Sequence, residues 1–294
     1  MTPPQELLDA IAREGAEERL RELDKQGKLT SALFPELEEG RGFEQPALHH
    51  YTVLEHNLSA VGALDRALGE GVEGVQLTDP SAENTLADWL ERKIDKHPLL
   101  HLLRLSCLVH DIAKPRTAVV REGRLRFPRH GPVGAELLEE RLASLGFEQN
   151  SIDFVTTMVR YHLRPGEFAR SWPPSDRALR RFARDVAGQT LPLLLLQLAD
   201  GMATRGPNYR RENFERHIAF LRHIVTRTEE ALQEDELPLV NGEELMKELG
   251  LPSGPLLGAV LTSVREAQLA GEVDDRAAAI ALARQSLEHL TAEA

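Results

Sequence analysis

Six residues of types that bind metals lie far apart in the sequence, each on or beside an apolar segment. They are His56, His110, Asp111, His130, His162 and Asp200. Side chains from several helices can converge at one point of a helical fold, so these imidazoles and carboxylates predict one closed set of metal ligands. His110 and Asp111 are adjacent, and successive side chains of a helix diverge by about 100°. We therefore expect the helix that ends there to point along its axis at the metal.

Each of these residues also has a purely structural interpretation. A single histidine on an apolar helix face is more often a core residue bonded to the backbone, and only the set of six favours metal binding. Asp111 and Asp200 make the stronger case, because an aspartate at the end of an apolar helix is costly to bury without a cation. The alternative for both aspartates is an ion pair with Arg104 or Arg205.

Helices must position these residues. Apolar residues recur at three- and four-residue spacing, which predicts helices over residues 51–68, 98–109, 132–145, 151–163, 176–187 and 192–203. His56 faces inward on the first helix, the second delivers His110 and Asp111, and Thr190 is the expected N-cap of the last. One small β-hairpin is predicted at residues 117–127, around a glycine turn.

The fold class is therefore all-α, in three parts. An N-terminal helical segment (1–48) precedes a metal-binding domain (49–232). The tail (233–294) begins with an acidic, loop-like stretch at 233–241 and continues as helices with Gly250 and Gly254 as breakers.

Composition narrows the functional classes. Hydrophobic residues make up 41% and charged residues 28% of the 294 residues, as in a folded globular protein. A net charge of −12 disfavours a globally basic nucleic-acid surface. Cys107 is the only cysteine, which excludes an intrachain disulfide and a thiolate-rich zinc site. No apolar run is long enough to span a bilayer and the first residues lack a secretion signal, so we expect a cytoplasmic protein that does not bind membranes.

Several motifs occur in a specific order along the chain. They are His50-Tyr-Thr-Val-Leu-Glu-His56, His110-Asp-Ile-Ala-Lys-Pro115, His130-Gly-Pro-Val-Gly-Ala135, Tyr161-His162-Leu-Arg-Pro165 and Leu198-Ala-Asp-Gly201, followed in the tail by Pro238-Leu-Val-Asn-Gly242 and Gly254-Pro-Leu-Leu-Gly258. This ordered set resembles HD-domain metal-dependent phosphohydrolases, and within them the HD region and tail of bacterial tRNA nucleotidyltransferases and poly(A) polymerases. The first fifty residues contain no β-rich unit with paired aspartates and no Gly-Ser dipeptide occurs, so nucleotide addition is not expected.

The resemblance implies a division of the ligands. His56, His110, Asp111 and Asp200 would hold one ion, and His130 and His162 would hold a second with Asp111 bridging. Two cations would activate a water and clamp phosphoryl oxygens. Manganese, nickel, magnesium, cobalt and iron all suit such ligands.

Other residues are expected to contact the substrate. By family likeness Lys114 would bind a phosphate or stabilise negative charge, and His50, ranked ahead of His49, would contact the substrate. Arg160 and Arg164 flank His162 and suit phosphate binding, although exposed helix arginines are the alternative. RNA contact is a further expectation for Arg177, Arg180, Arg181 and Arg184, whose alternative is a solvated helix face.

The leading hypothesis is a metal-dependent phosphohydrolase, acting on phosphomonoesters or 2′,3′-cyclic phosphates of nucleotides or RNA 3′ ends. Asp111 and Lys114 would be its catalytic residues. The alternatives are a non-catalytic RNA-binding or scaffold module, and a di-iron protein that performs oxygen chemistry.

Overall fold

The structure is a computed structural model that describes residues 4–69, 86–169, 172–235 and 238–292. Its regular structure is almost entirely helical, with two small antiparallel two-stranded sheets in the described residues. The all-α prediction is confirmed. The chain forms two compact units: Met1–Pro173 with Asp185–Val225, and Pro174–Arg184 with Thr226–Ala294. All six predicted ligands lie in the first unit.

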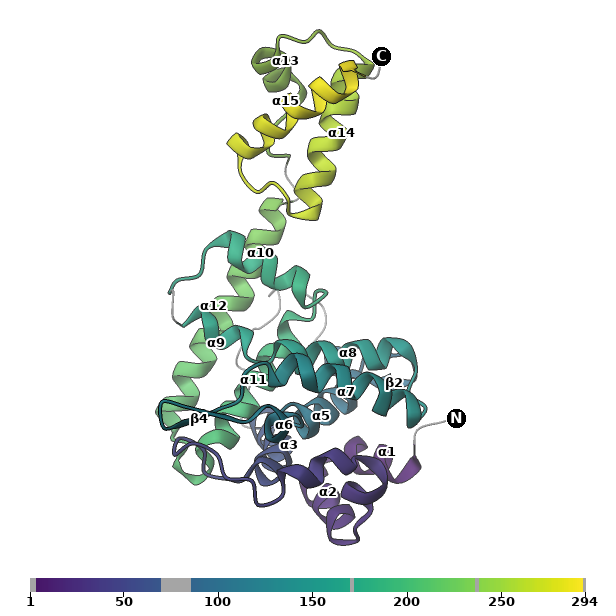
Figure 1. Ribbon diagram of the computed structural model, residues 1–294, viewed down its shortest axis with the longest axis vertical. Coiled ribbons are helices and arrows are strands. Elements are labelled where there is room, and N and C mark those ends of the chain that lie inside the picture. Colours follow the sequence, from purple (N-terminus) through teal and green to yellow (C-terminus); the bar gives the residue numbers. More distant parts are fainter. Residues whose placement is uncertain (1–3, 70–85, 170–171, 236–237, 293–294) are drawn as a thin grey trace. The chain divides into compact units, whose positions relative to one another are not determined.

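The first unit contains most of the helices (Figure 1). They are α1 (Gln5–Ala12), α2 (Ala16–Lys25), α3 (Val53–Gly69), α4 (Leu86–Leu90), α5 (Leu99–Val109), α6 (Lys114–Thr117), α7 (His130–Ser144), α8 (Gln149–Tyr161), α9 (Arg164–Phe168), α11 (Thr190–Arg205) and the first part of α12 (Arg211–Asp235), with short π or 3-10 turns at Leu29–Leu33, Pro35–Gly40 and Gly206–Asn208. Helices α3, α5, α8 and α11 pack on one another, and α7 packs on α8. This group of helices carries the predicted ligands.

Helix α5 is buried over nearly its whole length, as its apolar sequence predicts. Its polar side chains have partners: the Ser106 hydroxyl donates to the Leu102 carbonyl at 2.8 Å, and Arg104 donates to Asp65 at 2.8 Å and to the Ile11 carbonyl at 3.0 Å. Arg104 is therefore committed to Asp65 and is not the partner of Asp111. The helix ends at Val109, and His110 and Asp111 follow directly.

Two short hairpins lie beside the helices. Strands β3 (Val119–Arg121) and β4 (Arg124–Arg126) form the predicted hairpin, with Gly123 at φ 70° in the turn. The second pair, β1 (Lys93–Ile94) and β2 (His97–Pro98), was not predicted. Two residues per strand leave no hydrophobic periodicity to detect.

The predicted cap of α11 is wrong by one position. Gln189 occupies the N-cap without a side-chain cap bond, and Thr190 is the first helical residue. A cap at Thr190 would have to accept a hydrogen bond from the backbone N–H of Pro192 or Leu193. Pro192 has no N–H, and the Leu193 N–H already donates to the Gln189 carbonyl at 3.2 Å.

The second unit combines α10 (Asp176–Asp185) and the end of α12 with α13 (Gly242–Leu249), α14 (Pro255–Ala270) and α15 (Arg276–Ala292). A buried cluster that includes Leu245, Val260 and Ala279 forms its core. These boundaries differ from the predicted three-part division, because α10 groups with the tail and α12 continues through Asp235 into the stretch predicted as a loop. Gly250 ends α13 at φ 67°, as its role as a breaker predicts.

Among the described residues, the helices are all too short or too polar to cross a lipid bilayer.

Candidate metal centre

The six predicted ligands converge in the first unit. His56 comes from α3, His110 and Asp111 follow the end of α5, His130 begins α7, His162 follows the end of α8, and Asp200 lies on α11. They form two groups of three, each with ligand atoms within 4.8 Å of one another: His56, His110 and Asp200, and Asp111, His130 and His162.

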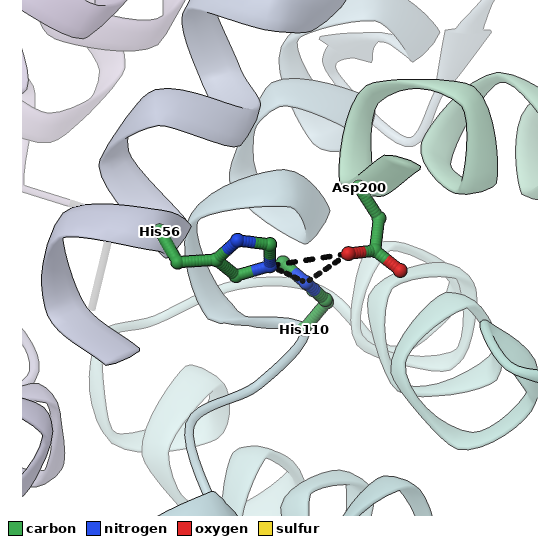
Figure 2. A group of neighbouring side chains, drawn as sticks. All are labelled: His56, His110 and Asp200. Carbon is green, nitrogen blue, oxygen red and sulfur yellow. Dashed lines mark hydrogen bonds and ion pairs between the residues drawn. The ribbon is translucent and has the colours of Figure 1, made fainter. Parts of the chain in front are cut away.

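In the first group, the side chains of His56, His110 and Asp200 point toward one another (Figure 2). The Nε2 atoms of His56 and His110 are 3.1 Å apart. Asp200 Oδ1 lies 3.1 Å from the His56 Nε2 and 3.7 Å from the His110 Nε2. Both histidines are completely buried, whereas the Asp200 side chain keeps 21% of its surface exposed. The group therefore opens to solvent on the Asp200 side.

The second group is arranged in the same way. The Nε2 atoms of His130 and His162 are 3.1 Å apart, and Asp111 Oδ1 lies 3.2 Å from the first and 3.6 Å from the second. Asp111 Oδ2 faces the other group, 3.3 Å from the Nε2 of both His56 and His110. One carboxylate thus lies between two pairs of imidazoles, with one oxygen directed at each pair.

Backbone carbonyls fix the orientation of three of the four imidazoles. In each case the Nδ1 lies at hydrogen-bond distance from the carbonyl oxygen three residues earlier: Cys107 for His110 at 2.8 Å, Phe127 for His130 at 2.7 Å, and Val159 for His162 at 2.7 Å. A carbonyl oxygen only accepts, so each Nδ1 carries a proton, and the Nε2 is the atom that presents a lone pair to a cation when the ring is neutral. The Nδ1 of His56 has no hydrogen-bond partner among the described residues.

Two lone pairs at 3.1 Å cannot hydrogen-bond to each other, so His130 and His162 need a cation, or an extra proton, between their Nε2 atoms. A proton is disfavoured there, because burial lowers the pKa of His162 and the neighbouring His130 lowers it as well. Neutral imidazoles and ionised carboxylates at converging atoms are the donor set of divalent transition metals. The six residues therefore fit two cations, one for each group.

The carboxylates are held ionised. Burial opposes the charge of Asp111, but Lys114 and His110 hold its pKa well below the usual range. Burial likewise opposes the charge of Asp200, whose pKa is held well below its usual range by hydrogen bonds from His110 and His56. Burial alone would lower the pKa of His110, but with no cation present these two carboxylates raise it to about 10. The centre is thus an anionic pocket that attracts positive charge.

Lys114 points at this centre and is 6% exposed, so it is not a solvated lysine at a helix end. Its Nζ lies 2.5 Å from Asp111 Oδ2, donates to Gln45 Oε1 at 2.7 Å, and lies 3.5 Å from the His49 Nε2. It also lies 5.4 Å from the centre of the Phe127 ring. These contacts hold the ammonium beside the bridging carboxylate.

His49 and His50 have different surroundings in the structure. The His49 ring lies 5.7 Å from the His56 ring, and burial followed by the charge of Lys114 lowers the pKa of His49 to about 4. His50 is exposed and packs against Tyr51, with ring centroids 4.6 Å apart. Its backbone amide donates to the Thr204 carbonyl at 2.8 Å. His49 is thus the one of the two whose ring packs on a predicted ligand, and substrate contact by His50 stays a prediction.

The arginines proposed for phosphate binding pair with carboxylates. Arg160 lies 3.8 Å from Glu139, and Arg164 donates to Asp185 at 2.8 Å. In the second unit, Arg177 pairs with Asp274 at 2.7 Å. The side chain of Arg184 packs against Gly271, within the space that a Cβ would occupy there. None of these contacts is made to the metal centre.

Sequence reasoning missed Gln45, which orients Lys114, and Thr204, whose hydroxyl donates to Asp200 Oδ1 at 3.2 Å. Thr204 lies four residues after Asp200 on α11, a spacing that could have indicated the contact. No local signal marks Gln45.

Comparison with known families bears directly on this centre. Residues 84–205 match the family model described as the HD domain. His110, Asp111, His130, His162 and Asp200 lie inside this range, and His56 precedes it. This part of the chain is similar to the HD domain. HD domains constitute a family of metal-dependent phosphohydrolases, so the predicted family resemblance is confirmed.

The curated relatives include two tRNA nucleotidyltransferases. The CC-adding tRNA nucleotidyltransferase of Thermus thermophilus is 33% identical over 258 residues, which cover 86% of this chain and 49% of the relative. The A-adding tRNA nucleotidyltransferase of Deinococcus radiodurans is 31% identical over 248 residues, 83% of this chain and 49% of the relative. The chain spans about half the length of these relatives, and the similarity extends well beyond the HD domain.

A more distant relative is a bifunctional uridylyltransferase/uridylyl-removing enzyme of Novosphingobium aromaticivorans. It is 28% identical over 161 residues, 54% of this chain and 15% of the relative.

Proposed function

We propose that this HD-domain chain is a metal-dependent phosphohydrolase that hydrolyses phosphomonoesters or 2′,3′-cyclic phosphates of nucleotides or RNA 3′ ends. The observation that carries the proposal is the position of Asp111 between two histidine pairs, with its oxygens 3.2–3.6 Å from all four Nε2 atoms. Two ions held around one carboxylate suit hydrolysis at phosphorus.

Each ligand group would hold one divalent cation, drawn from manganese, nickel, magnesium, cobalt and iron. When bound, the cations supply an activated water and neutralise charge on the phosphoryl oxygens. The chain itself orients the donor atoms. The carbonyls at the Nδ1 atoms hold three imidazoles with Nε2 toward the centre, and Thr204 holds Asp200.

Lys114 is the residue best placed to contact the phosphate. Its ammonium is anchored by Asp111 and Gln45, so a phosphoryl oxygen at the centre would meet a fixed positive charge that needs no rearrangement. Asp111 and Lys114 are therefore the proposed catalytic residues. His50, Arg160 and Arg164 remain proposed substrate contacts, and the two arginines would have to exchange their present carboxylate partners for phosphate.

The relatives support the proposed substrate class. Both tRNA nucleotidyltransferases have names that refer to tRNA, which supports an RNA 3′ end or a nucleotide as substrate and a cytoplasmic location. RNA contact through Arg177, Arg180, Arg181 and Arg184 of α10 belongs to the same proposal.

The test combines metal analysis with phosphate release. The protein is purified without chelator and assayed on 2′,3′-cyclic nucleotides, nucleoside monophosphates and an RNA with a cyclic-phosphate end. We expect metal-dependent release that His110→Ala and Asp111→Ala abolish while helical content is retained. His289→Ala, on α15 in the other unit, is the matched control and should be fully active.

Activity that persists in both ligand variants would overturn the mechanism. Tightly bound metal without release on any substrate would favour a binding module, and two bound irons that react with oxygen would favour oxygen chemistry.

A further inference from the structure

An aromatic face runs along α12, beginning beside the metal centre. We define it as His217, Phe220 and His223 of α12 together with Trp172, all in the first unit. Residues 217, 220 and 223 are three apart, so their side chains follow one side of the helix. All three are half-buried, whereas Trp172 is 49% exposed.

His217 joins this face to the centre. It packs on Gly201, the residue after Asp200, so closely that a Cβ at position 201 would lie 2.9 Å from the His217 ring. Its Nδ1 lies 3.1 Å from the Tyr209 hydroxyl, and its Nε2 bonds to the Gln197 side chain at 2.5 Å. Both ring nitrogens are occupied, so the imidazole is fixed in place next to a metal ligand.

The face then leads away from the centre through ring contacts. The His217 and Phe220 centroids are 6.5 Å apart, and Trp172 lies 5.4 Å from Phe220 and 4.6 Å from His223. From His217 to His223 the helix rises about 9 Å, at about 1.5 Å per residue. A ligand of one or two nucleotides at the centre would therefore reach Trp172.

Trp172 is the open end of the face. Phe220 and His223 support the indole, while about half of its surface remains exposed. A large aromatic side chain that is supported by its neighbours and open to solvent is a platform for a nucleobase, because every base has a flat π-face and stacking tolerates any sequence.

The charge around the face fits a polyanion. Residues 205–223 contain five arginines and two glutamates in a chain whose net charge is −12. Arg216 lies four residues before Phe220, on the side of α12 that carries Phe220 and His223. All five arginines are exposed: Arg205, Arg210, Arg211, Arg216 and Arg222.

We infer that Trp172, Phe220 and His223 stack the unpaired bases of a single-stranded RNA end, with Arg216 contacting its phosphates, while the terminal phosphate lies at the metal centre. This inference rests on the proposed function and narrows its substrate to an RNA end with accessible bases, recognised without sequence preference. A mononucleotide, which offers one base and no neighbouring phosphates, would bind more weakly.

Binding is measured apart from hydrolysis. The probe is fluorescein-labelled hexa-adenylate with a 3′-hydroxyl, followed by fluorescence anisotropy with metal-loaded protein at fixed salt, and an abasic oligonucleotide of the same length supplies the phosphates without bases. We expect hexa-adenylate to bind on the order of tenfold more tightly than the abasic strand. Trp172→Ala should remove this preference, and Trp172→Phe should keep most of it. Arg216→Ala should weaken the binding of both oligonucleotides. Arg222 lies about 120° from Arg216 around the helix, so Arg222→Ala should weaken their binding less.

A second readout reports on Trp172 directly. The chain has two tryptophans, Trp89 and Trp172, so in Trp89→Phe the emission comes from Trp172 alone. Hexa-adenylate should quench it and the abasic strand should not. Equal affinity for the two strands, or quenching absent at saturating hexa-adenylate, would overturn the inference even if phosphate release is found. Stacking without any phosphate release would uphold the inference and refute the proposed hydrolysis.

Discussion

Replacing Asp111 with asparagine should remove both metal ions, whereas the same replacement at Asp200 should remove only one. Asp111 Oδ2 lies 3.3 Å from the Nε2 atoms of His56 and His110, and its Oδ1 lies 3.2 and 3.6 Å from those of His130 and His162. Of the four imidazoles, Asp200 contacts the first pair, with its Oδ1 3.1 Å from the His56 Nε2 and 3.7 Å from the His110 Nε2. The two variants have the same chemistry and differ in how many ions they affect.

The magnitude follows from charge. A carboxylate at a nominal distance of about 4 Å from a divalent cation contributes about 8 kcal/mol at an effective dielectric constant of about 20, twice the value for two unit charges. If relaxation and the remaining amide oxygen offset half of this, about 4 kcal/mol is lost for each ion, or roughly a thousandfold in affinity. Asp111→Asn incurs this loss at both sites.

The assay is metal content after dialysis against a defined concentration of manganese, with affinities from calorimetric titration and helicity from circular dichroism. We expect two ions for the unsubstituted protein, none for Asp111→Asn and one for Asp200→Asn. Two ions bound to Asp111→Asn with unchanged affinity would refute the bridging arrangement. Loss of both ions from Asp200→Asn would refute the independence of the two groups.

Three further outcomes are expected. Lys114→Gln should lower the rate of phosphate release by about 100-fold and leave metal content unchanged, because it removes a fixed cation at the phosphate. The control is Arg116→Gln, which removes a surface cation paired with Glu39. A full rate of release in Lys114→Gln would contradict the catalytic role of Lys114. The Cys107 thiol is fully buried and its pKa is raised by burial, so a thiol reagent should label it only after denaturation. Fast labelling in native buffer would contradict this expectation and would show that the region around α5 opens. Burial lowers the pKa of His217 from 6.5 to about 4, so as the pH falls the unfolded state binds a proton before the folded state does. The free energy of unfolding should therefore fall by about 2 kcal/mol between pH 6.5 and 5. In urea unfolding, His217→Gln should show a pH dependence of this free energy that is smaller by that amount, and the same dependence in both proteins would refute the contribution of His217.

Local patterns in the sequence were sufficient for the helices that carry the ligands. The apolar stretch that became α5 is buried on most sides, and it delivers His110 and Asp111 at its end as expected. The glycine turn of the β3–β4 hairpin is likewise a local signal. Convergence of the six residues was predictable because desolvated aspartates and inward-facing histidines need partners, and partners of that kind are often metals.

Individual side-chain contacts around the centre, and the grouping of helices into units, were not predictable. Gln45 holds Lys114 across 69 positions of sequence, and no local pattern joins them. His49 and His50 are neighbours of the same type, and only the fold decides which one faces the centre. Helix α10 lies within the predicted metal-binding domain (49–232), but it packs with the tail through pairs such as Arg177 with Asp274.

The carbonyls behind His110, His130 and His162 belong to residues three positions earlier in the same stretch of chain. The tautomer of each imidazole is therefore set by the peptide backbone and not by a neighbouring side chain. Mutations that change residue identity around these histidines leave the acceptor in place, so side chains near the centre can diversify for new substrates while the donor atoms keep their direction. Insertions, deletions or prolines in those three turns would disturb the donor atoms most, and these are the changes that a family built on this centre would be expected to avoid.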